Sequence, residues 1–133
     1  MKKLSFITAA SVIGLTLQGC SNYQPIYNVS HQELPPLPTS FTEQDIGHTI
    51  REAAKDRGWA CTQTQPNKLI CKLRHHEDYV TIDIGFDKKN FSITHINAGK
   101  MDAGEDHVHR RYNRWVKLLR NDILNKLENR VNS

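Results

Sequence analysis

The stretch Tyr79–Phe86, which reads YVTIDIGF, is the clearest strand in the chain. Its apolar side chains Val80, Ile82, Ile84 and Phe86 recur at every second position. Because neighbouring side chains of a strand point to opposite faces, this alternation gathers the apolar groups on one face and the polar groups on the other. The stretch therefore predicts a sheet with one buried face and one polar face.

Shorter alternating segments on both sides of this strand complete the predicted sheet. Residues 59–63 and 69–73 alternate around turn residues at 65–67, which predicts a β-hairpin. Residues 91–96 follow the polar turn 87–90 and form a weaker strand. Short turns between successive strands favour an antiparallel meander of four strands, or of three where the weaker one is not counted.

Two segments have helical periodicity, one before the strands and one after them. In residues 42–57, Thr42 is a suitable N-cap, and Gly58 suits the position after the last turn. From about His107 to Leu127, apolar residues recur at helical intervals. The order α-β-β-β-β-α predicts an α+β fold, a two-layer sandwich with both helices on one face of the antiparallel sheet.

The first 20 residues have the features of a bacterial export signal. Two lysines precede an uncharged apolar stretch, residues 4–17, which is too short to span a bilayer. Leu17-Gln18-Gly19-Cys20 resembles a lipobox, and the resemblance implies removal of residues 1–19, lipid attachment at Cys20 and anchoring to a membrane. By resemblance to lipoprotein sorting in Gram-negative envelopes, Ser21, in place of Asp, favours the outer membrane, facing the periplasm. The alternative is an ordinary secretory signal with an incidental cysteine.

The mature chain divides into a tether and one domain. Residues 20–40 contain four of the five prolines, so we expect the lipid anchor to be followed by a Pro-rich tether. Residues 41–128 are expected to form the α+β domain and residues 129–133 a C-terminal tail. Loss of the two signal lysines lowers the net charge from +4 to +2, an excess too small to favour nucleic acid as a partner.

The two remaining cysteines are placed symmetrically in the predicted hairpin. Cys61 and Cys71 lie at equal distances from Pro66, so they face each other across the two strands. The cell envelope is an oxidising compartment. We therefore predict a Cys61–Cys71 disulfide, and the alternative is two buried free thiols.

The seven histidines are the residues that a metal site would use. A metal site needs three or four converging ligands, but the neighbours His75 and His76 point to opposite faces of a strand, and His107 and His109 diverge on a helix. We therefore expect scattered surface histidines, no metal ligand and no cofactor. A weak site that pairs His75 or His76 with residues 107–109 remains the alternative. Motifs such as G-x-S-x-G and H-E-x-x-H are missing from the sequence, so no catalytic residue is assigned.

A basic stripe marks the polar side of the last predicted helix. Arg110, Arg114 and Lys117 recur at helical spacing, and they form a candidate surface for anionic lipid headgroups or for an acidic envelope protein. The alternative is an ordinary solvated helix face. Asn113 flanks the apolar stripe of this helix and is included in the candidate interaction surface, because packing alone does not explain it.

The last helix also carries a resemblance. Its motif Y-N-x-W-V, from Tyr112 to Val116, is similar to a segment in small uncharacterised lipoproteins of Gram-negative bacteria. Further positions that fit the pattern are Ala53, Gly58, Trp59, Leu69, Arg74, Val80 and Ile82. The resemblance implies a fold and a place in the envelope, and it implies no activity.

Three functions are compatible with these observations. The preferred one is an outer-membrane-anchored periplasmic lipoprotein that acts as a binding or envelope-integrity module rather than as an enzyme. The second is a small periplasmic metal-binding protein or enzyme that uses His75, His76, His107 and His109. The third is a periplasmic inhibitor or immunity-type protein, with the disulfide hairpin as its contact surface.

Overall fold

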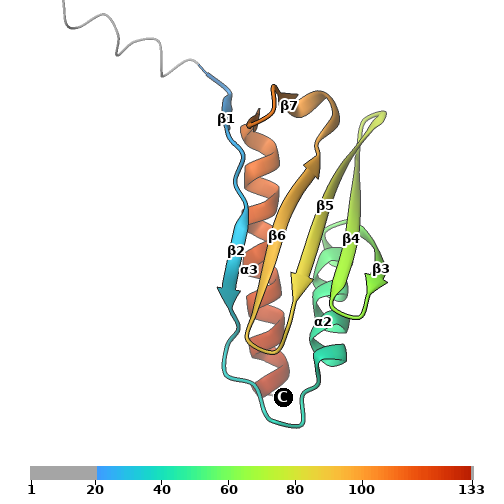
Figure 1. Ribbon diagram of the computed structural model, residues 1–133, viewed down its shortest axis with the longest axis vertical. Coiled ribbons are helices and arrows are strands. Elements are labelled where there is room, and N and C mark those ends of the chain that lie inside the picture. The colour runs from blue at the N-terminus through green and yellow to red at the C-terminus, as the bar shows by residue number, and fades with distance from the viewer. Residues whose placement is uncertain (1–20, 133) are drawn as a thin grey trace, which may run out of the picture.

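The computed structural model describes residues 21–132 and has an α+β fold with two antiparallel sheets and two helices (Figure 1). The predicted signal peptide and Cys20 lie outside the described residues. In chain order, the elements are β1 (Tyr23–Pro25), β2 (Val29–Glu33), α2 (Glu43–Asp56), β3 (Ala60–Gln65), β4 (Lys68–His75), β5 (Asp78–Phe86), β6 (Asn90–Asn97), the 3-10 helix η2 (Gly99–Met101), β7 (Asp102–Ala103), β8 (His107–His109) and α3 (Arg110–Asn132).

The larger sheet has five strands in the order β2-β6-β5-β4-β3. The predicted meander is present as β3 to β6, and all its pairs are antiparallel. The predicted count of four strands is wrong, because β2 pairs with β6 and adds a fifth. β5 lies at the centre, and its alternating side chains Val80, Ile82, Ile84 and Phe86 are buried as predicted.

A second sheet of three short strands, in the order β1-β8-β7, lies at one end of the molecule (Figure 1). It corrects the prediction that the last helix begins near His107, because His107–His109 form β8 and pair with β1 and β7. Val108 is fully buried there. Its spacing of four residues from Tyr112 imitates a helical repeat, although the two residues lie in different elements.

The N-terminal segment is also corrected. Residues 20–40 were expected to be a tether, but residues 23–25 and 29–33 are strands. Beyond β2, Leu34 is buried and Leu37 packs against the core, so this segment is part of the domain. At the other end, the expected tail 129–133 continues α3 as far as Asn132.

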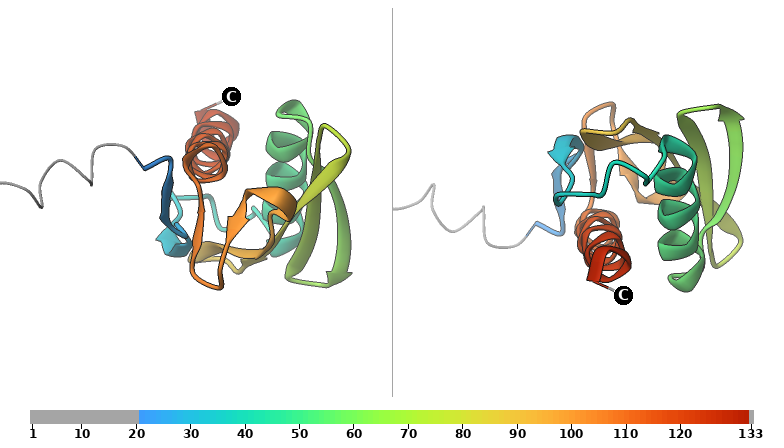
Figure 2. Two further views of the ribbon diagram at one scale, coloured as in Figure 1. Left: turned by 90° about the horizontal axis from the view of Figure 1, so that it is seen from above. Right: turned by 90° about the horizontal axis from the view of Figure 1, so that it is seen from below.

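Both helices lie on the same side of the larger sheet. Figure 2 shows α2 and α3 side by side, with the strands curving around them. α2 begins at a capping box, in which the Thr42 hydroxyl accepts from the Asp45 N–H and the Asp45 carboxylate accepts from the Thr42 N–H. Gly58 follows the helix with a φ of 94°, a conformation that glycine adopts without strain. The buried stripe of α3 closes the core with Tyr112, Val116, Leu119, Ile123 and Leu127.

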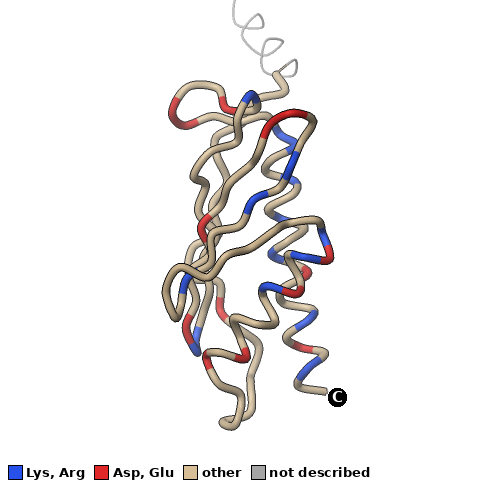
Figure 3. The backbone as a smooth tube through the Cα atoms, turned by 90° about the vertical axis from the view of Figure 1, so that its right-hand side faces the viewer, with Lys and Arg blue, Asp and Glu red and all other residues tan. Residues whose placement is uncertain are grey.

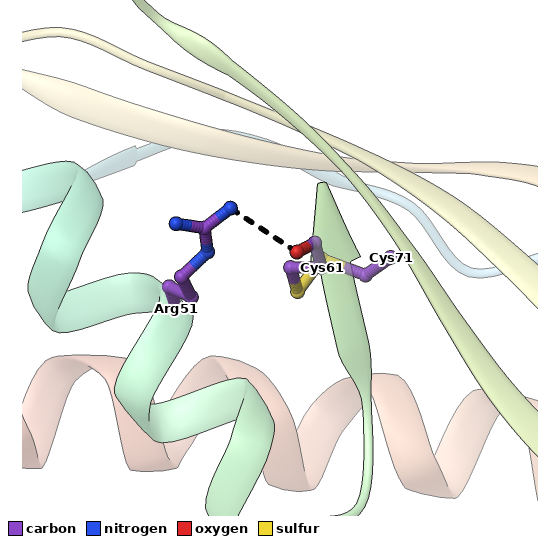
Figure 4. The surroundings of a disulfide bond; sticks show 3 residues. All are labelled: Arg51, Cys61 and Cys71. Atoms are coloured by element: carbon purple, nitrogen blue, oxygen red, sulfur yellow. Dashed lines mark hydrogen bonds between the residues drawn. A yellow bond between two sulfur atoms is a disulfide. The ribbon is translucent and has the colours of Figure 1, made fainter. Parts of the chain in front are cut away.

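The predicted disulfide is present in the β3–β4 hairpin. Cys61 lies directly opposite Cys71, their Cα atoms are 4.0 Å apart, and their sulfur atoms are bonded. This close spacing is that of a pair whose own N–H and C=O groups point away from the partner strand. The carbonyl of Cys61 therefore points to the free edge of the sheet, where Arg51 of α2 donates to it at 3.2 Å (Figure 4).

Removal of this disulfide is expected to destabilise the domain by about 2.5–3 kcal/mol, because a cross-link over a separation of ten residues restricts the unfolded chain by about that much. The measurement is urea unfolding of the Cys61→Ala/Cys71→Ala variant. Wild type in a thiol reductant is the control, since it loses the cross-link without a substitution. Two titratable thiols in the denatured, unreduced mature domain would contradict the disulfide.

Candidate functional site

The end of the molecule that carries the three-stranded sheet contains most of the residues that the sequence singled out. At its centre, Asn113 is only 4% exposed. Its Oδ1 accepts from the Tyr27 N–H at 2.9 Å, and its Nδ2 donates to Gln24 Oε1 at 3.1 Å and to the Pro25 carbonyl at 3.0 Å. All the hydrogen-bonding groups of the Asn113 side chain are therefore used to hold the N-terminal segment against α3.

Further contacts fasten the same segment. The Arg110 N–H donates to the Asn22 carbonyl at 2.8 Å, and the Ile26 N–H donates to the Asp106 carbonyl at 3.0 Å. The Tyr27 hydroxyl accepts from Arg120 at 2.9 Å, and the ammonium group of Lys117 lies 5.0 Å from the centre of the Tyr27 ring. From Asn22 onward, the chain is therefore bound to the domain.

The predicted basic stripe lies beside this fastened segment. Arg110, Arg114 and Lys117 are exposed, together with Arg111, and they line a groove of about 690 Å³ between α3 and β1. Asn22 and Gln24 form the other wall of this basic groove, and Asn113 is at its floor. The structure thus brings the four predicted interaction residues together, but the amide of Asn113 is occupied by the N-terminal segment.

The two halves of α3 differ in how their charges are paired. In the C-terminal half and facing α2, ion pairs join Asp122 to Arg57, Lys126 to Asp56, and Arg130 to Glu52. Within residues 21–132, no carboxylate is paired with the four cations of the basic groove. Arg110 and Arg111 also begin the helix, where the macrodipole disfavours positive charge.

The histidines of the alternative metal site do not converge. His75 and His76 are in ring contact with each other, and the His75 ring also contacts Trp115. His109 contacts the ring of Tyr23, and His107 pairs with Asp106. In the part of the chain that the structure describes, no three His, Cys, Asp or Glu side chains are placed to hold a metal ion.

The surroundings of His75 favour its neutral form. Partial burial lowers its pKa, and the positive charges of His76 and Arg111 lower it further.

A second polar cluster escaped the sequence analysis. His95 Nε2 lies 2.7 Å from Asp102 Oδ1, and the other oxygen of Asp102 accepts from the Ala98 N–H. The Tyr112 ring packs edge-on against His95, while the Tyr112 hydroxyl is buried without a hydrogen-bond partner among residues 21–132. Burial and the nearby Asp102 raise the Tyr112 pKa above its ordinary value, so the phenol stays protonated in alkaline solution as well as at neutral pH.

One signal of this cluster was present in the sequence. His95 continues the alternation of Phe91 and Ile93 on the buried face of β6, so a polar side chain stands at an apolar position. Such a residue requires a polar partner in the core. Its partner Asp102 lies in a segment that the sequence predicts to be a loop. No periodic pattern there indicates that Asp102 would contact His95.

Comparison with known proteins assigns the chain to no family and to no function. No family model matches the chain, and no curated protein matches it. The resemblance to small Gram-negative lipoproteins therefore stays a prediction. None of the helices within residues 21–132 is long and apolar enough to cross a membrane.

Replacement of Asn113 by alanine is expected to lower the free energy of unfolding by about 2–3 kcal/mol, because it leaves the Tyr27 amide and the Pro25 carbonyl without partners. Amide exchange at Tyr27 should accelerate. The matched control is Asn125→Ala, at an exposed position of the same helix, which should change stability by less than about 0.5 kcal/mol. A Tyr27 amide that stays fully protected in Asn113→Ala would contradict this role.

The Tyr112→Phe variant is expected to be more stable than wild type by about 1 kcal/mol, because it removes a buried hydroxyl that has no partner. Tyr27→Phe is the control, since it removes a hydroxyl that accepts a hydrogen bond from Arg120 and should be neutral or destabilising. Thermal unfolding of both variants measures the difference. A loss of stability in Tyr112→Phe would show that the hydroxyl has a partner, such as an ordered water.

Proposed function

We propose that this chain is a lipid-anchored protein of the bacterial envelope, attached through Cys20 to the outer membrane and facing the periplasm, where it acts by binding rather than by catalysis. The observation that carries the proposal is the fastened N-terminal segment. Asn22, two residues after the predicted anchor, already bonds to Arg110, and β1 begins at Tyr23. An anchor placed there joins the membrane to a structured domain without an intervening tether.

This arrangement gives the proposed anchor a mechanical role. Two extended residues span about 7 Å, so the domain stays at the membrane surface. The contacts of Asn113 and Arg120 with the segment around Tyr27 limit how far the domain can turn about its anchor. The anchored domain would thus be limited to a range of orientations that keep the basic groove on the anchored side.

The proposal predicts that wild-type protein incorporates labelled fatty acid and that Cys20→Ala does not, because the Cys20 thiol accepts the lipid. Fractionation of the envelope should place wild type in the outer membrane and Ser21→Asp in the inner membrane. Ser40→Asp is the matched control, since it makes the same change at an exposed position far from the anchor and should not alter sorting. Wild-type protein without lipid label would contradict the proposal.

A further inference from the structure

The walls of the basic groove are unusual in their charge. Between Asp106 and Asp122 the sequence contains five Lys and Arg residues and no Asp or Glu. The opposite wall is formed by Asn22 and Gln24, and the segment 21–32 around them contains no Asp, Glu, Lys or Arg. The groove therefore has a positive field that no carboxylate on either wall cancels. Figure 3 shows this run of cations along the upper part of α3, with acidic residues in the loops above it.

The groove is open to a ligand. Arg110, Arg111, Arg114 and Lys117 are exposed, and the described part of the chain supplies none of them with a carboxylate partner. Elsewhere in the same helix, cations are used in ion pairs to α2. Positive charge at the beginning of α3 also opposes the helix dipole. An external anion relieves both the mutual repulsion of these cations and their unfavourable position.

The position of the groove near the N-terminus indicates which anion it binds. This inference rests on the proposed lipid anchor at Cys20. Asn22 lines one end of the groove and is two residues from Cys20, so this end lies within about 7 Å of chain from the anchor. That distance is comparable to the Debye length of about 8 Å at physiological salt. The phosphates of the membrane that holds the anchor are therefore the nearest anions, and guanidinium groups bind phosphate well.

We propose that the basic groove, formed by Arg110, Arg111, Arg114 and Lys117, docks on anionic phospholipid headgroups of the membrane that carries the anchor. The side of α3 and β1 then faces the bilayer. Tyr23, on β1 and 46% exposed, stands at the headgroup level, where aromatic rings with a polar tip are favoured. The acidic residues in the loops 77–78 and 102–106 do not line the groove.

The test uses a chain that begins at Ser21, which carries every described element but no lipid, so that docking is measured apart from anchoring. It should sediment with vesicles of phosphatidylcholine and phosphatidylglycerol, but not with phosphatidylcholine alone. Each cation near an anionic surface contributes about five-fold to binding, so Arg110→Gln/Arg114→Gln/Lys117→Gln should weaken the partition by about 100-fold. Added salt should weaken wild-type binding in the same direction.

The matched control is Lys72→Gln/Lys88→Gln/Lys89→Gln, which removes the same charge from exposed positions outside the groove. It should keep most of the binding. Both variants should remain folded, which thermal unfolding checks, because the replaced side chains are exposed. Equal losses in the two variants would overturn the proposal, since net charge alone would then explain binding. Sedimentation with isolated peptidoglycan but not with vesicles would overturn it in favour of the cell wall. Neither outcome bears on lipid attachment at Cys20, which labelling tests separately.

Discussion

The hydrogen bonds of Asn113 tie the first strands of the fold to its last helix. A single amide satisfies two backbone groups and a side chain of the segment 24–27, which is nearly the whole domain away in sequence. With that segment in place, β1 pairs with β8, and the chain continues into β2 at the edge of β6. The basic groove exists only because β1 lies against α3. The fastened segment therefore shapes both the second sheet and the candidate site.

The sequence predicted the elements whose evidence is local. The alternation in Tyr79–Phe86, the hairpin with its disulfide, and the apolar stripes of both helices were all confirmed. The segment 23–33 was missed because only Val29 of its two strands is buried, so pairing with β6 and β8, rather than its own pattern, makes it extended. The candidate site shows the same difference. The basic stripe could be predicted from the helical spacing of its residues, whereas the partners of Asn113 could not, because they are distant in sequence.

The distribution of charge along α3 separates side chains that stabilise the fold from side chains that are available for binding. In the C-terminal half of α3, charged side chains form ion pairs that join the two helices. In the N-terminal half, a row of cations has no carboxylate partner among the described residues and lies where the helix dipole disfavours positive charge. Exposed ion pairs contribute little to stability, so the stabilisation gained in the C-terminal half is modest. Apart from the contact of Lys117 with the Tyr27 ring, the unpaired row contributes nothing favourable to folding, and this is the physical reason for considering it a binding surface.

The contact between Arg51 and the Cys61 carbonyl bears on how copies of this protein meet. β3 is an edge strand, and an open edge offers its backbone to any extended chain. Here a guanidinium group occupies one carbonyl of that edge, and the disulfide prevents β3 from peeling away from β4. If the chain is anchored to a membrane as we propose, it shares a two-dimensional surface with its own copies and meets other sheet edges far more often than in dilute solution. The Arg51 contact and the disulfide would then make this edge less available for pairing with another copy.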